Sequence, residues 1–393
     1  MTEKRRCKYI FVHGLSGWGS YDEMYQRMPY WGMRGGDLMK YLKEQGFSCY
    51  AASVAPTGSA WDRACELYAQ LAGTRVDYGK AHSEKYRHER FGKDFTGNPL
   101  IPDWGPETRI VLLGHSFGGV TVRLFSELLA NGDPAEQAAV GGIALSEQAA
   151  VGGIALSEQA AVDDIAPEQK AGDDISPFFK GGMGERVCGI VTLAAPTNGT
   201  TAYDLFQDPS FHPEKVKVPW WSKPLANMMS KGTRPQVDGR DARDYAGNDM
   251  QIDNAIALNQ KITTFPHVYY FSVPCSFTVQ QPDGTHKPKK KMEPLFVMRA
   301  YQIGAYKGRT AGGMEIDETW RENDGLVNTF SATAPIGAPS KPLEKDNIEP
   351  GIWNVFPSYD GDHMALQGGL MKKHNIRNFY LELLQTIDGC LQQ

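Results

Sequence analysis

A serine in the stretch GHSFGG is the first residue of this chain whose setting suggests chemistry. Gly114, Ser116 and Gly118 form a Gly-x-Ser-x-Gly pattern, in which a serine on a tight turn can act as a nucleophile. The chain contains 42 glycines, so the bare pattern should arise by accident in roughly one chain in five of this composition. The pattern alone therefore does not separate a nucleophile from a serine in a glycine-rich turn.

The residues on either side of Ser116 favour the nucleophile. RIVLLGHS (109–116) is typical of a buried strand, and VTVRLFSELLANG (120–132) has helical spacing that ends at Gly132. A sharp turn between a strand and a helix lifts the serine hydroxyl above the sheet and aims the positive end of the helix dipole at it. The context predicts covalent catalysis by Ser116.

A serine hydroxyl needs a histidine base, and the base needs a carboxylate that fixes its tautomer. His363 is the preferred base because it lies in the polar loop SYDGDHMAL, after the last strand-like run. Asp324, at the Asp-Gly turn of RENDGLVNTF, is the preferred acid. The other histidines after Ser116 are His212, His267, His286 and His374, and the rival acids are Asp317, Asp360 and Asp362.

The oxyanion formed by attack on a carbonyl needs two N–H donors. We expect one from the backbone of Phe117, directly after the nucleophile. We expect the other from Leu15, in the loop HGLSGWGS that follows the first strand-like run. The side chains of Leu15 and Phe117 would then line the acyl site without donating hydrogen bonds.

Alternating strand-like and helix-like stretches must position these residues. The expected strands are 8–14, 48–56, 109–116, 186–196 and 267–273, and the expected helices are 36–47, 62–73 and 120–132. Near-continuous apolar strands separated by helices predict an α/β fold with a buried, mostly parallel sheet. We expect one elaborated domain over residues 1–393. Residues 276–360 are rich in turns, with few clear elements.

Composition excludes several classes of protein. Hydrophobic residues make up 41% of the chain, charged residues 22%, and the formal net charge is −5. The one basic run, KPKKK (287–291), is interpreted as a solvated hairpin tip, so no nucleic-acid partner is expected. No apolar stretch is long enough to span a bilayer, and we identify no signal peptide. The six cysteines lack CxxC spacing and are expected to be mostly buried free thiols, although pairing stays open.

Two segments depart from the alternation of strands and helices. Residues 133–177 contain AAVGGIALSEQ twice in tandem, which favours an expanded surface loop over a short helical arm. Residues 202–250 contain Trp220, Trp221 and further aromatic and methionine side chains among prolines and charges. This segment is interpreted as lid-like, a flap or binding surface, or else as a satellite core under a long loop.

With these residues in view, the chain resembles the bacterial lipases of family I.5, the secreted α/β-hydrolases of thermophilic bacilli and staphylococci. The matching stretches are VHGLSGWG, YWGMRGGDLMKYL, WDRACELYAQLAGTRVDYGKAH, RHERFG, GHSFGG, APTNGTT, WRENDGLVNT and YDGDHM. The resemblance implies an α/β-hydrolase fold and a Ser116–His363–Asp324 triad. It also implies an extracellular protein, although the absence of a signal peptide leaves a cytoplasmic location open.

The resemblance further implies a structural zinc site. Asp62, His82 and His88 match the family's ligands directly and define a zinc-binding insert at residues 62–100. Asp244 is the best match for the fourth ligand, with Asp241 or Asp249 as alternatives. Two imidazoles and two carboxylates in a closed tetrahedron suit structural zinc.

Two departures from the family pattern change what is expected. Ala365 and Leu370 stand where the family places calcium-binding acids, so calcium binding of the family type is not expected. The segment between residues 199–201 and the fourth zinc ligand is much shorter than the family's lid region. A reduced lid would leave a more open site, weaker interfacial activation and access for bulky esters, including polymeric ones.

These observations predict a carboxylic ester hydrolase, most specifically a triacylglycerol lipase, that works through an acyl-enzyme. Its partner would be an ester or lipid substrate. A polyester hydrolase or an acyltransferase with the same triad is the alternative among enzymes. A lipid-binding protein on an inactive hydrolase scaffold is the alternative without catalysis, and the presence of all three triad residue types argues against it.

Overall fold

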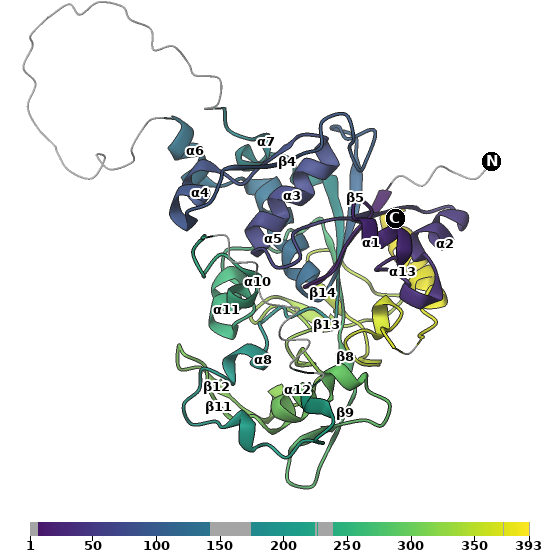
Figure 1. Cartoon of the computed structure of the whole chain (residues 1–393). Coiled ribbons are helices and arrows are strands. Elements are labelled where there is room, and N and C mark those ends of the chain that lie inside the picture. The colour runs from purple at the N-terminus through teal and green to yellow at the C-terminus, as the bar shows by residue number, and fades with distance from the viewer. Residues whose placement is uncertain (1–6, 142–173, 225, 227–238, 372, 393) are drawn as a thin grey trace, which may run out of the picture.

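The core of the protein is a sheet of seven strands, seen in a computed structural model that describes residues 7–141, 174–224, 226, 239–371 and 373–392 (Figure 1). Every pairing between neighbouring strands of this sheet is parallel. The strands, in spatial order, are β13 (Ser340–Pro342), β14 (Trp353–Val355), β7 (Tyr269–Val273), β6 (Val187–Leu193), β5 (Arg109–His115), β1 (Cys7–Val12) and β2 (Ser48–Ala52). The predicted α/β fold with a mostly parallel sheet is confirmed.

Helices cover both faces of the sheet, as a parallel sheet requires. Helices α3 (Ala60–Ala72) and α5 (Phe117–Asn131) pack on one face, where Ile10 and Val12 of β1 point. Helices α2 (Leu38–Glu44) and α13 (Arg377–Leu391) pack on the other, where Tyr9 and Phe11 point (Figure 1). Alternate residues of one strand thus enter two separate hydrophobic clusters.

The remaining elements lie around this core. The other helices are α1 (Glu23–Arg27), α4 (Lys80–Tyr86), α6 (Pro134–Gly141), α7 (Pro177–Lys180), α8 (Thr201–Asp204), α10 (Ala246–Asp249), α11 (Ile252–Asn259) and α12 (Pro294–Ala305). The 3₁₀ turns are η1 (Met33–Gly35), η2 (Gly184–Arg186), η3 (Pro213–Lys215), η4 (Glu318–Trp320) and η5 (Ala365–Gln367). In the described part of the chain, four two-stranded sheets pair β3 (Arg75–Asp77) with β4 (Phe91–Asp94), β8 (Cys275–Ser276) with β15 (Tyr359–Asp360), β9 (Thr278–Gln280) with β10 (His286–Pro288), and β11 (Gly308–Arg309) with β12 (Glu315–Ile316).

The five expected strands and three expected helices all correspond to observed elements, with ends that differ by a few residues. The expectation of few clear elements in 276–360 missed helix α12 and strands β13 and β14. Helix α12 lacks a continuous polar face because Phe296 and Ala300 enter one hydrophobic cluster while Ile303 enters another. A helix buried between two clusters has no amphipathic period to detect in its sequence.

A small cap lies below the sheet in Figure 1, built from α8, α11, α12 and the hairpins β9–β10 and β11–β12. Its own hydrophobic cluster consists of Ala202, Leu205, Ile252, Ile303, Tyr306, Ile316 and Trp320. Helix α12 joins this cap to the main fold, because Phe296 of the same helix packs its ring edge-on against His363 at 6.1 Å between ring centroids. The cap therefore adjoins one of the predicted catalytic residues.

Several smaller expectations can be located on the structure. All six cysteines lie in its described part and are free thiols, five of them buried. Among the described residues, no helix is long and apolar enough to cross a membrane. Most of the predicted loop insertion 133–177 lies outside the described residues, but its described flanks α6 and α7 lie together, with Asp133 N and Gln137 Nε2 both donating to the carbonyl of Phe179.

Asp204, the last residue of α8, makes stability of the cap sensitive to pH. Burial raises the pKa of its carboxyl to about 7, although it accepts a hydrogen bond from Ile252 N at 3.1 Å. In an unfolded chain an aspartate titrates near pH 4 (about 3.9). Between about pH 4 and 7 the folded protein therefore holds a proton that the unfolded chain has lost, and stability falls as pH rises through this window.

The substitution Asp204→Asn should remove this cost while keeping an acceptor for Ile252 N. We expect the midpoint of thermal unfolding to rise by about 3 to 6 °C at pH 8.5 and to change little at about pH 3, where the wild-type carboxyl is protonated in both the folded and the unfolded chain. Differential scanning calorimetry at the two pH values is the measurement. An equal change at both pH values would contradict the assignment.

Asp208, in the same cap, provides a control because its pKa is shifted in the opposite direction. Burial alone would raise its pKa, but hydrogen bonds from Ser210 and from Arg309 N and Tyr306 lower it to about 2. The ionised form is therefore the stabilised one, and Asp208→Asn should lower the unfolding temperature at pH 7. This difference in unfolding temperature should disappear as pH falls from about 4 to 2, because the unfolded carboxyl takes up its proton near pH 4 and the folded one only near pH 2.

Candidate active site and metal centre

Ser116 sits on a strained turn between β5 and α5. Its backbone has φ 54° and ψ −130°, which is a conformation that few residues other than glycine adopt. Ser116 N donates to Leu193 O at 2.8 Å, so the turn is tied to the carboxyl end of the neighbouring strand β6. Helix α5 begins directly after the serine, and its N-terminus faces the hydroxyl.

The two motif glycines are required by close backbone contacts at this turn. A Cβ on Gly114 would lie 2.3 Å from Gly118 O, and a Cβ on Gly118 would lie 2.3 Å from Val12 O at the end of β1. No side chain fits at either position without moving the backbone. The two glycines of the Gly-x-Ser-x-Gly pattern, which was weak evidence by itself, are therefore a steric requirement of this turn.

Three of the predicted residues meet in one hydrogen-bonded chain. His363 Nε2 lies 2.9 Å from Ser116 Oγ, and His363 Nδ1 lies 2.8 Å from Asp324 Oδ2. All three side chains are buried. Nδ1–H donates to the carboxylate, which leaves Nε2 to accept the serine proton. This geometry can generate a serine alkoxide-like nucleophile and return a proton to a leaving group.

Asp324 is held so that one carboxylate oxygen faces His363. Its other oxygen, Oδ1, accepts from Leu326 N at 2.9 Å and Val327 N at 2.8 Å. His363 N also donates to the backbone carbonyl of Asp324 at 2.9 Å, which ties the two loops together. The rival acids are engaged elsewhere: Asp317 caps η4, Asp360 pairs with Lys289, and Asp362 accepts from Glu293 N.

The loop after β1 passes beside the nucleophile. A Cβ on Gly14 would lie 2.7 Å from Ser116 Cβ, so only a glycine permits this approach. Leu15 follows in the same loop and is half-buried, while Phe117 is buried at the start of α5. The loop that carries Leu15 and the first residue of α5, Phe117, thus both lie next to Ser116.

Four buried polar residues around this loop were missed by the reading of the sequence. His13 and Tyr30 form hydrogen bonds to Gly14 in the loop, and Tyr30 also forms one to His115. Arg63, fully buried in α3, donates to the carbonyls of His13 and Ala55. Histidines beside a glycine, and a tyrosine and an arginine in apolar surroundings, give no local sign of these long-range contacts.

The four predicted metal ligands converge on a second site, next to α3. Asp62, His82, His88 and Asp244 each offer one ligand atom, and these atoms all lie within 4.8 Å of one another. The sequence alternatives do not join them: Asp241 pairs with Arg243, and Asp249 accepts from Ala60 N. The fourth position in the cluster is thus occupied by Asp244.

The spacing of these atoms fits a tetrahedral ion. His82 Nε2 lies 3.3 Å from Asp62 Oδ1 and 3.2 Å from Asp244 Oδ1, and His88 Nε2 lies 3.3 Å from Asp244 Oδ2. Ligand atoms about 2.0–2.1 Å from a tetrahedral zinc are separated by roughly 3.3–3.4 Å. Asp62 Oδ1, His82 Nε2, His88 Nε2 and Asp244 Oδ1 are buried and make no well-formed hydrogen bond among the described residues.

Neighbouring groups orient the two imidazoles. His88 Nδ1 lies 2.9 Å from the carbonyl oxygen of Glu89, which leaves Nε2 unprotonated and free to bind a metal. Trp61 stacks flat on His82 at 4.9 Å between ring centroids. Glu136 of α6 accepts from the backbone N–H groups of Ala81 and His82 and so fixes the start of α4. The cluster is closed by four protein ligands, as in structural sites.

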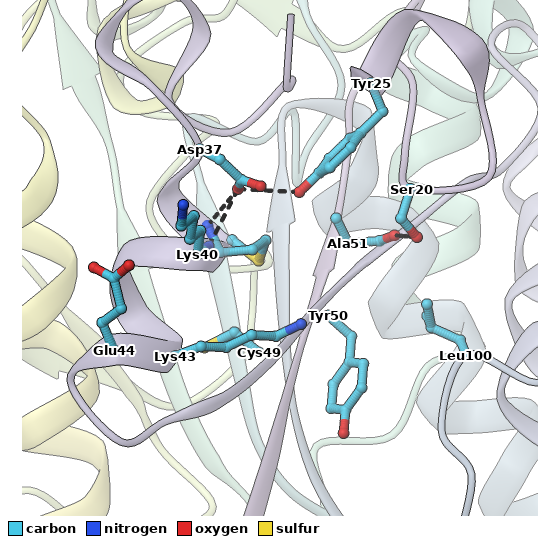
Figure 2. A pocket seen from close by; sticks show the side chains of 11 residues that line it. Ser20, Tyr25, Asp37, Lys40, Lys43, Glu44, Cys49, Tyr50, Ala51 and Leu100 are labelled. Atoms are coloured by element: carbon cyan, nitrogen blue, oxygen red, sulfur yellow. Dashed lines mark hydrogen bonds between the residues drawn. The ribbon is translucent and has the colours of Figure 1, made fainter. Parts of the chain in front are cut away.

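A surface pocket of about 740 Å³ lies between α2 and the edge strand β2 (Figure 2). None of the residues that line it belongs to the triad or to the metal cluster. Asp37 points to the backbone of α2, which it caps, and to Tyr25 Oη at 3.2 Å, while Lys43 lies over the Tyr50 ring. The polar groups of this pocket thus serve the local structure of α2.

Comparison with protein families identifies one match over most of the chain. The model described as lipase-like, C-terminal domain, matches residues 6–146 and 236–388. A lipase of Staphylococcus epidermidis is 31% identical over 387 residues, which cover 93% of this chain and 50% of that protein. A lipase of Staphylococcus hyicus is 30% identical over 403 residues, which cover 96% of this chain and 57% of that protein. The chain thus spans about half the length of these curated relatives.

Solved structures agree with this comparison. The crystal structure of Staphylococcus hyicus lipase matches with a TM-score of 0.76 and 29% identity, covering 99% of this chain and 98% of that one. EstA from Clostridium botulinum matches with a TM-score of 0.75 and 26% identity, covering 98% of this chain and 87% of that one. The similarity to these two structures therefore extends over nearly the whole chain.

Proposed function

This chain belongs to the lipase-like family, and from that membership we propose that it is a carboxylic ester hydrolase acting on lipid esters. The observation that carries the proposal is the hydrogen-bonded chain from Ser116 through His363 to Asp324, at 2.9 and 2.8 Å. Hydrolysis of p-nitrophenyl butyrate and of tributyrin, together with labelling of Ser116 by a fluorophosphonate, tests it. A protein that neither hydrolyses these esters nor reacts with the label would overturn it.

The geometry supports a two-step mechanism through an acyl-enzyme. His363 Nε2 takes the proton of Ser116 Oγ as this oxygen bonds to the ester carbonyl carbon. The N–H groups of Leu15 and Phe117 stabilise the oxyanion, and His363 then returns the proton to the alcohol as the ester C–O bond breaks. A water molecule, deprotonated by His363, attacks the acyl-enzyme and releases the acid and the free serine.

The metal cluster suits a structural role in this proposal. A zinc ion would be held by Asp62, His82, His88 and Asp244, and it would cross-link α3, α4 and the turn before α10. Four protein ligands leave no open position for a substrate or water, so the ion takes no part in ester hydrolysis.

The segment 202–250, predicted to be lid-like, presents an apolar turn to solvent in its described part. Trp220 is 82% exposed and Trp221 43% exposed, on a turn closed by hydrogen bonds from Ser222 N and Oγ to Pro219 O. The lysines next to them, Lys215, Lys217 and Lys223, are exposed as well. Indole rings favour the boundary between lipid and water, and lysines favour anionic lipid surfaces. We assign this turn to contact with the lipid surface.

Removing both indoles should affect emulsified substrates more than dissolved ones. For Trp220→Ser combined with Trp221→Ser, we expect the ratio of activity on emulsified tributyrin to activity on soluble p-nitrophenyl acetate to fall roughly 3- to 10-fold, because apolar area that would enter the interface is lost. Met24→Ser, which removes from α1 an apolar side chain about as exposed as Trp221, is the control. A ratio unchanged in the tryptophan variant, or lowered as much in the control, would refute the assignment.

Polyester hydrolysis and acyl transfer use the same triad and remain the second candidates. The short segment between residue 201 and Asp244 favours an open site that admits bulky esters. A panel of p-nitrophenyl esters of rising chain length, emulsified triglyceride and polyester film separates the hydrolases. Formation of a new ester when an alcohol is added in excess would identify acyl transfer, since the alcohol then replaces water in the second step.

A further inference from the structure

Three buried side chains hold the loop that carries the predicted oxyanion donor, and one of them also reaches the catalytic base. The side chains are His13, Tyr30 and His115, and each is less than 5% exposed. They come from the end of β1, from the loop before η1 and from the end of β5. Two of these side chains, His13 and Tyr30, thus bond to the two peptides on either side of Gly14, and the third links Tyr30 to His363.

The orientation of the Gly14–Leu15 peptide depends on His13. Val54 N donates to His13 Nε2 at 3.2 Å, so the proton of this imidazole is on Nδ1. Nδ1–H then donates to Gly14 O at 2.8 Å. In a trans peptide the carbonyl and the following N–H point in opposite directions. Holding Gly14 O toward His13 therefore turns Leu15 N–H away from His13.

The preceding peptide is held by Tyr30. Gly14 N donates to Tyr30 Oη at 3.0 Å, and Tyr30 Oη lies 2.8 Å from His115 Nδ1. Burial lowers the pKa of His115, so this imidazole is neutral. Its Nε2 lies 2.9 Å from the carbonyl oxygen of His363, which can only accept, so Nε2 carries the proton. Nδ1 is then the acceptor, and the Tyr30 hydroxyl donates to it.

The directions of these bonds form one relay. Gly14 N–H donates to Tyr30, Tyr30 donates to His115, and His115 donates to the backbone carbonyl of His363. The relay begins at the loop that carries one oxyanion donor and ends at the residue that acts as base. We propose that His13, Tyr30 and His115 are positioning residues that fix the orientation of the oxyanion donor Leu15 N–H relative to the base His363. This inference rests on the proposed function.

The substitution Tyr30→Phe keeps the ring and removes the middle of the relay. We expect kcat for p-nitrophenyl butyrate to fall about 10- to 100-fold, with KM changed by less than about threefold, because a misplaced donor weakens the transition state more than the ground state. Affinity for an alkyl trifluoromethyl ketone, whose adduct with Ser116 bears an oxyanion, should fall with kcat. A role in stability alone would leave both unchanged.

Tyr270→Phe is the matched control. Tyr270 is also buried, and its hydroxyl also accepts a backbone N–H, from Phe265 at 2.8 Å. It lies in β7 and contacts neither the oxyanion loop nor the base. We expect this variant to lose thermal stability to a similar degree as Tyr30→Phe while keeping the wild-type kcat. Wild-type kcat and ketone affinity in Tyr30→Phe would overturn the proposal.

A double variant tests whether the residues act as one relay. His115→Gln keeps a donor near the position of Nε2 but removes the acceptor for Tyr30. Both single variants then break the same Tyr30–His115 bond, so the double variant should lose no more kcat than the larger single loss. Additive losses would overturn the relay. A wild-type protein without esterase activity would instead overturn the proposed function itself.

Discussion

Replacement of Ser116 by alanine is expected to abolish ester hydrolysis, with kcat for p-nitrophenyl butyrate lowered about 10⁴- to 10⁶-fold. The hydroxyl is the group that attacks the carbonyl, and His363 Nε2, at 2.9 Å, takes its proton in the first step of the proposed reaction. Any remaining rate would come from substrate binding and from the oxyanion donors, which do not depend on the hydroxyl. The labelling of the protein by a fluorophosphonate should disappear with the activity.

The fold should survive this substitution. Alanine experiences the same strain as serine at φ 54°, and among the described residues the side-chain hydrogen bond that is lost is the one to His363. We expect the unfolding temperature to stay within about 3 °C of the wild type. Calorimetry on the same preparation checks this, so that lost activity is not confused with lost structure.

Ser126→Ala is the matched control for Ser116→Ala. Ser126 is buried in the same helix α5, nearly three turns further on, and its hydroxyl makes no hydrogen bond among the described residues. This variant should keep the activity and the labelling of the wild type. Wild-type hydrolysis by Ser116→Ala would instead show that another residue is the nucleophile.

Removal of the proposed zinc ion is expected to produce the second large effect, a fall of about 10 °C or more in the unfolding temperature. Without an ion, buried carboxylate oxygens and imidazole nitrogens would remain within 4.8 Å of one another, and some of them would be only 3.2–3.3 Å apart. Arg240 contacts this cluster at Asp62 Oδ2 and Asp244 Oδ2. Metal analysis should find one equivalent of zinc in the protein as purified and none after prolonged dialysis against a chelator.

Two aspartates of the same segment provide a sharp comparison for the metal site. Asp244→Asn should lower the zinc content and the unfolding temperature together, because a neutral amide is a poor zinc ligand. Asp241→Asn should do neither, since Asp241 pairs with Arg243 and Arg87 at the surface. Equal zinc content in the two variants, or purified protein without zinc, would contradict the proposed site. Neither variant should change the chemistry at Ser116 while the protein stays folded.

Local sequence patterns determined the main chain around the nucleophile. The apolar run RIVLL, the glycines of GHSFGG and the helical spacing that follows predicted β5, the turn and α5, because each feature depends on residues a few positions apart. The strands of the sheet were predicted for the same reason. The order of Ser116, Asp324 and His363 in the chain also came from the sequence, whereas the residues of the metal cluster were implied by the resemblance to the lipase family.

Tertiary structure decided which of several equivalent residues meet. Nothing local separates Asp324 from Asp362 or Asp244 from Asp241, and only packing of distant loops brings His363 to Ser116, 247 positions away. Helix α12 was missed because both of its faces are buried and its sequence has no amphipathic period. Tyr30 and His115 were missed because a buried polar side chain gains its role from partners far along the chain. Periodicity and turn chemistry are local properties, whereas hydrogen-bond partners in a core are set by the whole fold.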